Sequence, residues 1–150
     1  MRLSLARARR AGGGAAGPKV ERQKELLRRA RAASRRAYAP YSHVRVGAAA
    51  LAASGRMFTG CNVENASYGL TVCAERVAIQ SAISAGEREI VALAVSSPDM
   101  RGISPCGACR QVMAEFASRE GLVVVMEGER DPRAVVLEKL IPQAFKLSRR

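Results

Sequence analysis

The sequence has little aromatic character: its 150 residues include three tyrosines, three phenylalanines and no tryptophan. Proteins that bind single-stranded nucleic acid stack bases on aromatic side chains, so this composition argues against that class. No segment approaches eighteen consecutive apolar residues, so we expect no membrane-spanning helix and no membrane partner. Apolar residues still make up 48% of the chain, and a chain of this length can bury a core with them.

Acidic residues are scarce at the start of the chain. Residues 1–36 contain 12 of the 25 lysines and arginines but only two of the 13 acids, so they carry +10 of the net charge of +12. Residues 37–150 are close to neutral at +2. We therefore expect no basic binding face on the folded part and no nucleic-acid partner.

The first twenty residues are rich in arginine, alanine and glycine and contain no acid. We interpret residues 1–20 as a basic, disordered extension and residues 21–150 as one domain. An organellar transit segment is the alternative, but Ser4 is the only hydroxyl residue in it. The apolar run at residues 3–6 is too short for a secretory signal, so the four cysteines indicate the reducing cytoplasm.

Hydrophobic patterns predict strands interleaved with helices, which is typical of an α/β fold. Gly47 lies in the first predicted strand and indicates a bulge or a close backbone approach. Thr71 and Ser104 are placed to cap two of the helices. The first two strands should pair as an antiparallel hairpin and the later ones should be parallel, giving a mixed sheet. The predicted helices cover residues 20–38, 71–85 and 104–119, the strands cover 44–53, 57–63, 90–96 and 122–126, and a short helix or turn covers 135–141.

Three cysteines stand close to the predicted helix starts. Cys73, Cys106 and Cys109 offer three thiolates, the number that a catalytic zinc site with one open position uses. Glu75 follows Cys73 by two residues and could serve as a general acid and base at that position. A structural site completed by His43, the only histidine, is the competing interpretation, but it leaves Glu75 without a role.

The sequence Cys-Ala-Glu at 73–75, followed by Pro-Cys-Gly-Ala-Cys at 105–109, resembles the zinc-dependent cytidine deaminases of the small, homotetrameric, three-cysteine type. The likeness covers roughly residues 22–147. It extends to the segments 41–43, 46–48, 60–69, 104–112 and 141–142.

This resemblance implies a three-layer αβα sandwich around a five-stranded mixed sheet, with active sites shared between subunits of a homotetramer. It implies one Zn²⁺ per subunit, held by Cys73, Cys106 and Cys109, and Glu75 as the shuttle that takes a proton from zinc-activated water. The implied reaction is hydrolytic deamination of cytidine and deoxycytidine to uridine and deoxyuridine with release of ammonia, as in pyrimidine salvage.

The same resemblance assigns substrate contacts. Asn62 and Glu64 match the pair that binds ribose hydroxyls, and the backbone around Ala74 and Cys106 would read the edge of the base. Arg76 matches the arginine that donates to the zinc thiolates. Three further positions, Ala66, Tyr68 and Phe145, match residues that reach a neighbouring subunit's site.

Val44 departs from the family pattern, which commonly has a phenylalanine there. Loss of an aromatic ring should weaken binding of the base without abolishing catalysis. Arg110 could also donate to the thiolates, with a weaker claim than Arg76, and the alternative is an exposed helix residue.

Two other functions compete with this prediction. One is a deaminase of another aminopyrimidine, such as blasticidin S, although Asn62 and Glu64 favour a substrate with a ribose. The other is a structural zinc protein that binds nucleic acid through its basic extension. The near-neutral charge of residues 37–150 and the presence of Glu75 argue against it.

Overall fold

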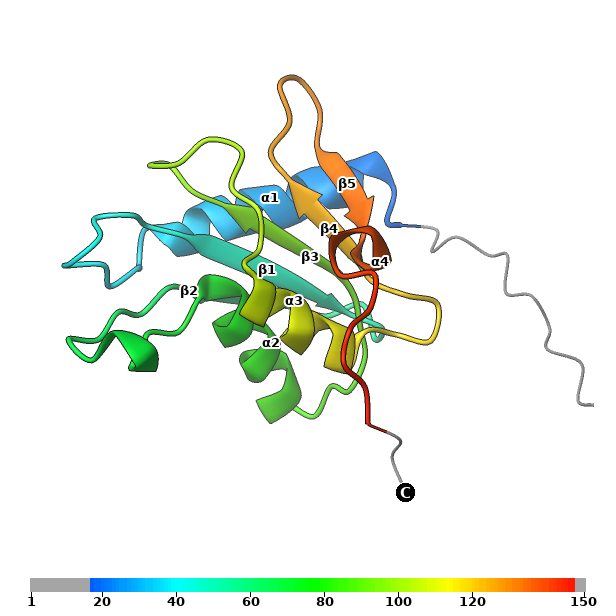
Figure 1. The fold of residues 1–150 in the computed structure, drawn as a ribbon. Helices are drawn as coiled ribbons and strands as arrows, with labels where there is room; N and C mark the ends of the chain where they lie inside the picture. Colours follow the sequence, from blue (N-terminus) through cyan, green and yellow to red (C-terminus); the bar gives the residue numbers. More distant parts are fainter. Residues whose placement is uncertain (1–16, 148–150) are drawn as a thin grey trace, which may run out of the picture.

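The computed structural model describes residues 17–147 (Figure 1). Residues 1–16 of the predicted basic extension lie outside the described residues. The described elements, in chain order, are α1 (Val20–Ser34), β1 (Gly47–Ala52), β2 (Met57–Cys61), the 3-10 helix η1 (Tyr68–Leu70), α2 (Ala74–Ser84), β3 (Ile90–Ser96), α3 (Gly107–Phe116), β4 (Val123–Met126), β5 (Arg133–Val136) and α4 (Leu137–Leu140).

The five strands form one mixed sheet in the order β2-β1-β3-β4-β5. β1 is antiparallel to both β2 and β3, β3 and β4 are parallel, and β4 and β5 are antiparallel. The predicted hairpin of the first two strands and the predicted mixed sheet are confirmed. The register pairs Gly47 with Ser96, so the loop before β1 and the loop after β3 leave the sheet at the same end.

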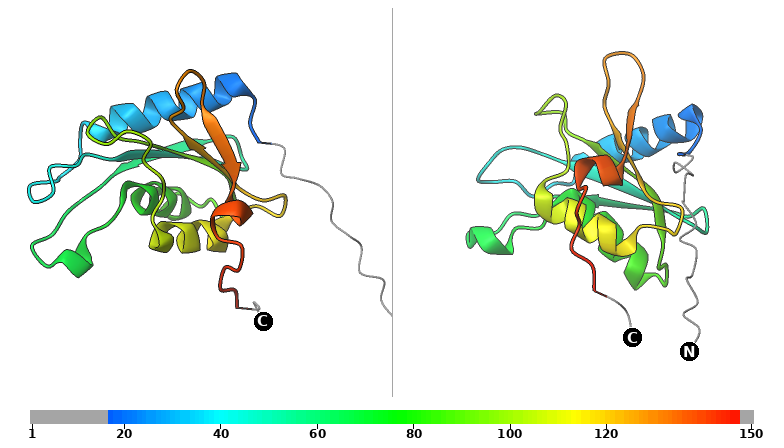
Figure 2. Two further views of the ribbon diagram at one scale, coloured as in Figure 1. Left: turned by 45° about the horizontal axis from the view of Figure 1, so that its top comes forward. Right: turned by 45° about the vertical axis from the view of Figure 1, so that its right-hand side comes forward.

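Helices cover both faces of the sheet, as Figures 1 and 2 show. Side chains along β1 alternate between the two faces. Ala49 and Leu51 pack with Leu26 and Ala30 of α1, whereas Ala48 and Ala50 pack on the side of α2 and α3. The predicted αβα sandwich is therefore confirmed.

Two glycines set the distance between the sheet and its helices. A Cβ atom on Gly60 of β2 would lie 2.5 Å from the backbone nitrogen of Ala78 and 2.6 Å from the carbonyl oxygen of Ala74. A Cβ atom on Gly47 would collide in the same way with the backbone of α1 at Ala30. The close approach predicted at Gly47 is confirmed. The backbone of α1 lies directly against the backbone of β1, and the backbone of α2 lies directly against that of β2.

The predicted helix 20–38 ends earlier, at Ser34. The cause is Tyr38, which donates a backbone hydrogen bond to Asn62 O (3.0 Å) and accepts one from Glu64 N (2.8 Å). This pairing draws residues 37–38 away from helical geometry and toward the segment after β2.

The predicted helix caps are wrong. α2 and α3 begin after Cys73 and Cys106, and neither cap residue makes a side-chain cap hydrogen bond. Thr71 instead accepts a hydrogen bond from Asn65 N (3.2 Å), and Ser104 accepts one from Arg110 (3.2 Å). Both hydroxyls therefore fasten the preceding loops.

The residue patterns did not predict β5. It is a four-residue edge strand that is exposed over its first half, and it follows Pro132 directly. The short helix predicted over 135–141 is α4, which is only four residues long. Within residues 17–147, no helix is both long enough and apolar enough to cross a membrane.

Candidate active site and zinc centre

The N-termini of α2 and α3 bring three thiols together. Cys73 and Cys106 are the residues that precede these two helices, and Cys109 lies in the first turn of α3. Their three sulfur atoms lie within 4.8 Å of one another, with 4.0 Å between Cys73 Sγ and Cys106 Sγ. Tetrahedral zinc with bonds of about 2.3 Å needs sulfur atoms about 3.8 Å apart, so the arrangement fits the ion.

His43 is not part of this cluster. Among the described residues, the only group of three or more potential ligands is the three thiols. His43 lies in the loop before β1, where its backbone takes a positive φ of 58°. A Cys₃His structural site is therefore wrong, and the three thiols leave a fourth metal position open.

Glu75 lies beside the thiols in the first turn of α2. Its residue surface is only 4% exposed, and this burial raises the pKa of its carboxyl group. A buried carboxyl group with a raised pKa is suited to accept and return a proton.

Arg76 lies next to the thiols. Its guanidinium group donates to Cys73 Sγ (3.4 Å) and to Thr71 O (3.2 Å). A hydrogen bond from Cys109, together with Arg76, lowers the pKa of Cys73 to about 5. Arg76 Nε is buried and has no hydrogen-bond partner among the described groups. The site therefore favours the thiolate form of Cys73, and the Nε–H of Arg76 is a further donor beside it.

A second polar group forms where the loop before β1 meets the end of β2. The Asn62 side chain donates to Val44 O (2.8 Å) and accepts from Val46 N (2.8 Å). Glu64 accepts hydrogen bonds from Tyr41 N (2.9 Å) and Ser42 N (3.2 Å).

The Ser42 hydroxyl also donates to Glu64. This hydroxyl and the two backbone donors lower the pKa of Glu64, so its carboxylate is charged. Asn62 and Glu64 are both buried. Together they hold the loop that contains Val44.

A short backbone pairing connects the two polar groups. Val63, between Asn62 and Glu64, exchanges two hydrogen bonds of 3.0 Å with Val72, the residue before Cys73. The predicted ribose pair and the predicted zinc ligands are therefore adjacent. Ala74, which was expected to contact the base, is buried at the start of α2, directly after Cys73.

The three residues expected to reach a neighbouring subunit lie on the surface. Ala66 is exposed in the loop after β2, and Tyr68 is 66% exposed with its ring centroid 6.2 Å from that of Tyr41. Phe145 is 70% exposed in the segment after α4. The described chain does not bury any of them in its own core.

Arg110 is neither an exposed helix residue nor a donor to the sulfur atoms in the hydrogen bonds that its guanidinium group makes. Its guanidinium donates to Pro105 O (2.8 Å), Leu140 O (2.9 Å) and Ser104 Oγ (3.2 Å). It thus ties the loop that precedes Cys106 to the end of α4. Two of these partners are backbone carbonyls, one of them thirty residues away, so no local sequence signal could reveal them.

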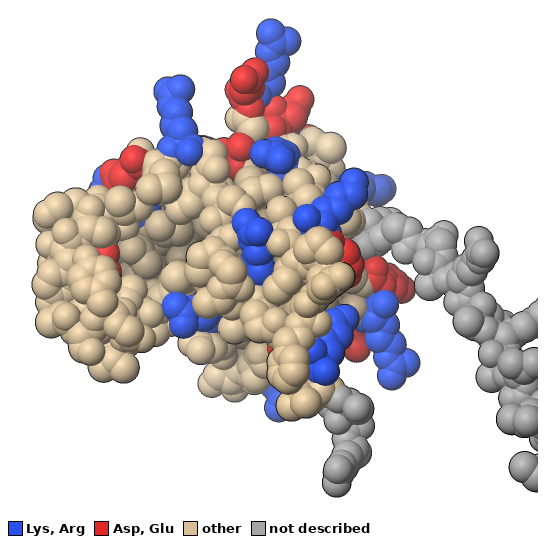
Figure 3. All heavy atoms as spheres, in the orientation of Figure 1, with Lys and Arg blue, Asp and Glu red and all other residues tan. Residues whose placement is uncertain are grey.

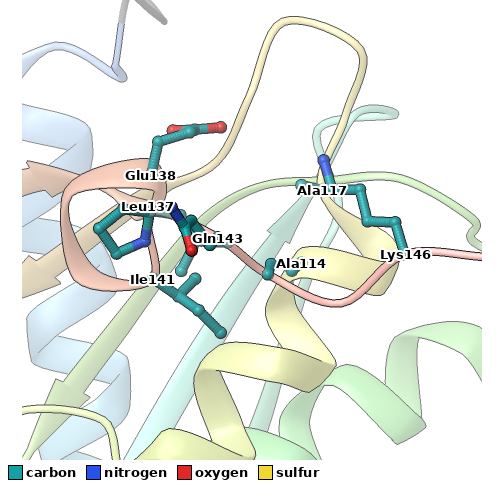
Figure 4. A pocket seen from close by; sticks show the side chains of 9 residues that line it. Ala114, Ala117, Leu137, Glu138, Ile141, Gln143 and Lys146 are labelled. Carbon is teal, nitrogen blue, oxygen red and sulfur yellow. The ribbon is translucent and has the colours of Figure 1, made fainter.

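The C-terminal segment packs against α3 and leaves a cavity of about 240 Å³, shown in Figure 4. Gln111 of α3 fixes this segment through a hydrogen bond from its side chain to Phe145 O (2.8 Å). No predicted site residue lines the cavity, so it is separate from the thiols. Its lining residues are Ala114, Ala117, Leu137, Glu138, Ile141, Pro142, Gln143, Ala144 and Lys146.

The sequence that contains this site matches a known protein family. Residues 20–126 match the family model described as the cytidine and deoxycytidylate deaminase zinc-binding region. The chain belongs to the cytidine deaminase family. The predicted zinc cofactor is confirmed, since the matched region contains the three thiols whose geometry fits one ion.

Individual relatives agree with this family. The chain is 46% identical over 120 residues to a cytidine deaminase of Halalkalibacterium halodurans, covering 80% of this chain and 91% of that protein. It is 48% identical over 111 residues to a probable cytidine deaminase of Dictyostelium discoideum, covering 73% of this chain and 74% of that protein.

Solved structures agree as well. The crystal structure of cytidine deaminase from Burkholderia pseudomallei superposes with a TM-score of 0.74 at 48% identity, covering 81% of this chain and 98% of that one. Cytidine deaminase from Mycobacterium tuberculosis gives a TM-score of 0.71 at 43% identity, covering 83% and 97%. The expected deaminase fold and enzyme class, a zinc-dependent hydrolytic deaminase, are confirmed.

Proposed function

We propose that the protein hydrolyses cytidine to uridine and ammonia, with Glu75 as its proton shuttle. The observation that carries the proposal is a buried carboxyl group, 4% exposed, beside three thiols with one metal position left open. The relatives described above, which are named as cytidine deaminases, support cytidine as the substrate.

Each residue at the thiol end has a distinct task. Cys73, Cys106 and Cys109 would hold zinc, which when bound supplies a Lewis acid that makes water a nucleophile at neutral pH. Glu75 would take up a proton from the water, deliver it to the pyrimidine ring nitrogen and assist the departure of ammonia. Arg76 would donate to the thiolates and offset part of their charge.

Asn62 and Glu64 would bind the sugar hydroxyls. Their hydrogen bonds to backbone do not exhaust their capacity, because an amide nitrogen has two hydrogens and each carboxylate oxygen has more than one lone pair. A substrate without the hydroxyl would leave a buried polar group unpaired, which strongly disfavours its binding. This pair supports a nucleoside substrate over another aminopyrimidine.

The base would lie between the backbone at Ala74 and the side chain of Val44. Val44 is only partly buried, and Asn62 holds its carbonyl oxygen. We expect deoxycytidine to be accepted together with cytidine, which corresponds to a role in pyrimidine salvage.

A homotetramer with shared sites would use the exposed apolar side chains near the site. They lie on two neighbouring segments, 38–41 and 63–70, and on the segment after α4. The region at the left of Figure 3, over these two segments, carries few charged groups, which supports contact with another copy. Ala66, Tyr68 and Phe145 would then contribute to a neighbour's site.

Residues 21–150 would form the catalytic domain and residues 1–20 a basic extension without a catalytic role. The matched family region begins at residue 20, which supports this division. All four cysteines are free thiols, which is compatible with a reducing cytoplasm.

The proposal is tested by incubating the purified protein with cytidine and measuring uridine and ammonia together with zinc content. We expect the two products in equal amounts and about one zinc per chain. Removal of zinc with a chelator should abolish product formation, and added zinc should restore it. Retention of full activity after complete zinc removal would contradict the proposal.

A further inference from the structure

Arg45 lies in the loop before β1 and is held by hydrogen bonds to the loop after β3. The carboxylate of Asp99 accepts from three nitrogens of Arg45: the backbone N (2.9 Å), Nε (2.9 Å) and Nη2 (2.8 Å). Two of these contacts form the paired arrangement of a guanidinium with a carboxylate, and the third fixes the backbone.

Ser97 holds the other side of Arg45. Its hydroxyl donates to Arg45 O (2.7 Å) and accepts from the backbone nitrogens of Asp99 and Met100 (3.2 Å each). The same loop therefore binds the backbone N–H of Arg45 through Asp99 and its backbone carbonyl through Ser97. The Ser97 hydroxyl also orients Asp99 by accepting from its backbone nitrogen.

The residues on either side of Arg45 orient Asn62. Val44 O accepts from the side-chain nitrogen of Asn62, and Val46 N donates to its side-chain oxygen, each at 2.8 Å. A rotated amide would place oxygen against oxygen and N–H against N–H, so these contacts select one orientation. That orientation is maintained only while Val44 and Val46 keep their places.

The other end of the same loop is held by Glu64 through Tyr41 and Ser42. The loop is thus fixed by one carboxylate at each end, with the backbone turn at His43 between them. Hydrogen bonds from Arg45 hold the pKa of Asp99 at about 2, so the charge is present throughout the pH range of an activity assay.

The Arg45–Asp99 pair lies near the surface, where an ion pair contributes little to stability. The Arg45 side chain is 50% exposed and the Asp99 side chain 26%. The main effect of the Arg45–Asp99 pair is therefore to fix the position of the backbone of residues 44–46.

We infer that Asp99 is a positioning residue for sugar recognition, which holds Arg45 and thereby sets the orientation of the Asn62 amide toward the nucleoside. This inference rests on the sugar-binding role proposed for Asn62. It gives the start of the loop after β3 a part in selecting the ribose. The zinc ligand of that loop, Cys106, lies at its other end, directly before α3.

The test compares cytidine with 2′,3′-dideoxycytidine, which lacks both ring hydroxyls but keeps the base. For Asp99→Asn we expect kcat/KM for cytidine to fall about tenfold, mainly through KM, and kcat/KM for the dideoxynucleoside to change less than about twofold. Arg45→Lys keeps the charge but loses the paired geometry, so it should give the same loss. Activity on the dideoxynucleoside and zinc content show that each variant is folded.

Two further variants complete the design. Glu87→Gln is the matched control, because Glu87, like Asp99, forms an ion pair with an arginine and a hydrogen bond with a serine. Its partners, Arg56 (3.3 Å) and Ser54 (2.7 Å), lie in the β1–β2 hairpin and not in the loop that holds Asn62. It should leave both values unchanged. Asn62→Ala should abolish the preference for cytidine.

If Asn62→Ala removes the preference and Asp99→Asn keeps it, the inference is overturned while the sugar role of Asn62 stands. If Asn62→Ala keeps the preference, the sugar role fails and the inference fails with it. An equal loss on both nucleosides in Asp99→Asn would show a general structural effect and also overturn the inference.

Discussion

Three acidic residues around the site, Glu75, Glu64 and Asp99, have different environments. These environments shift their pKa values in different directions and suit them to different roles. Burial raises the pKa of Glu75, which suits proton transfer. Hydrogen bonds from Ser42 and from backbone lower the pKa of Glu64, and those from Arg45 lower that of Asp99. Glu64 and Asp99 therefore remain charged and hold a loop in place, whereas the raised pKa of Glu75 supports the proton exchange proposed for it.

At Val44 we predict that an aromatic ring improves substrate binding. Val44→Phe should add stacking on the base, which is worth ~1–3 kcal/mol, so KM for cytidine should fall about fivefold or more. The value of kcat should change little, because the side chain does not take part in proton transfer. Steady-state kinetics on both proteins measures this. An unchanged or raised KM in the variant would contradict the prediction.

Residue types and short spacings were sufficient to predict the thiols and Glu75, because these groups lie within a few residues of helix starts. Arg110 and Asp99 were not predictable in this way. Their partners are Leu140 O and the backbone of Arg45, thirty and fifty-four residues away in sequence. A backbone N–H or carbonyl group leaves no mark in the amino-acid pattern, so such contacts require the folded structure.

At the scale of elements, α2 is placed by its contact with β2 at Gly60. We predict that Gly60→Ala displaces α2, because its Cβ would lie 2.5 Å from Ala78 N and 2.6 Å from Ala74 O. The free energy of unfolding should fall by about 1–3 kcal/mol or more, and zinc content should fall with it because Cys73 precedes α2.

Denaturant unfolding and zinc analysis measure the effects of Gly60→Ala. Gly69→Ala is the matched control, since a Cβ there meets nothing within 4 Å. Equal stability of the Gly60 variant and the wild type would show that β2 and α2 are not in close contact.

For α1 we predict a pH-dependent contribution from Glu25. Hydrogen bonds from Arg28 and Arg29 lower the pKa of Glu25 from 4.5 to about 2. A carboxylate with a lowered pKa stabilises the folded state above its ordinary pKa, and this contribution is lost as pH falls through the folded-state pKa. The Tm of the wild type should therefore exceed that of Glu25→Gln at pH 7, and the difference should disappear between pH 4.5 and 2.

Thermal unfolding of both proteins across this pH range measures the contribution of Glu25. Added salt at pH 7 should also reduce the difference, because these side chains are partly exposed. A difference that stays constant down to pH 2 would show that its origin is not the charge on Glu25.

The element boundaries show what hydrophobic periodicity can and cannot establish. It located β3 at its observed residues, because the strand Ile90–Ser96 is apolar up to its last residue and buried almost throughout. It missed β5, whose first two residues, Arg133 and Ala134, are both exposed although they point to opposite faces of the sheet. It also extended α1 too far, because the pairing of Tyr38 with the segment after β2 is a tertiary contact.

At the scale of the whole molecule, the exposed position of Phe145 is explained if it serves a neighbouring subunit. We predict that Phe145→Ala and Glu75→Ala are each poorly active, and that mixing the two restores activity. In a mixed assembly, a site with intact Glu75 can receive Phe145 from the other variant.

Refolding the two Phe145 and Glu75 variants together, with each refolded alone as the control, measures this complementation. The mass of the assembly in solution should correspond to four chains. Activity of the mixture that equals the average of the two variants would contradict a shared site.

The central claim is that Glu75 moves protons at a site whose metal is held by three thiols. The measurement that tests it most directly is cytidine turnover by Glu75→Gln at a known zinc content, beside the wild type and Glu138→Gln, an exposed glutamate of α4. We predict that Glu75→Gln keeps its zinc and loses roughly 10²–10⁴-fold in kcat, while Glu138→Gln behaves as the wild type. Turnover by zinc-loaded Glu75→Gln at the wild-type rate would contradict the account.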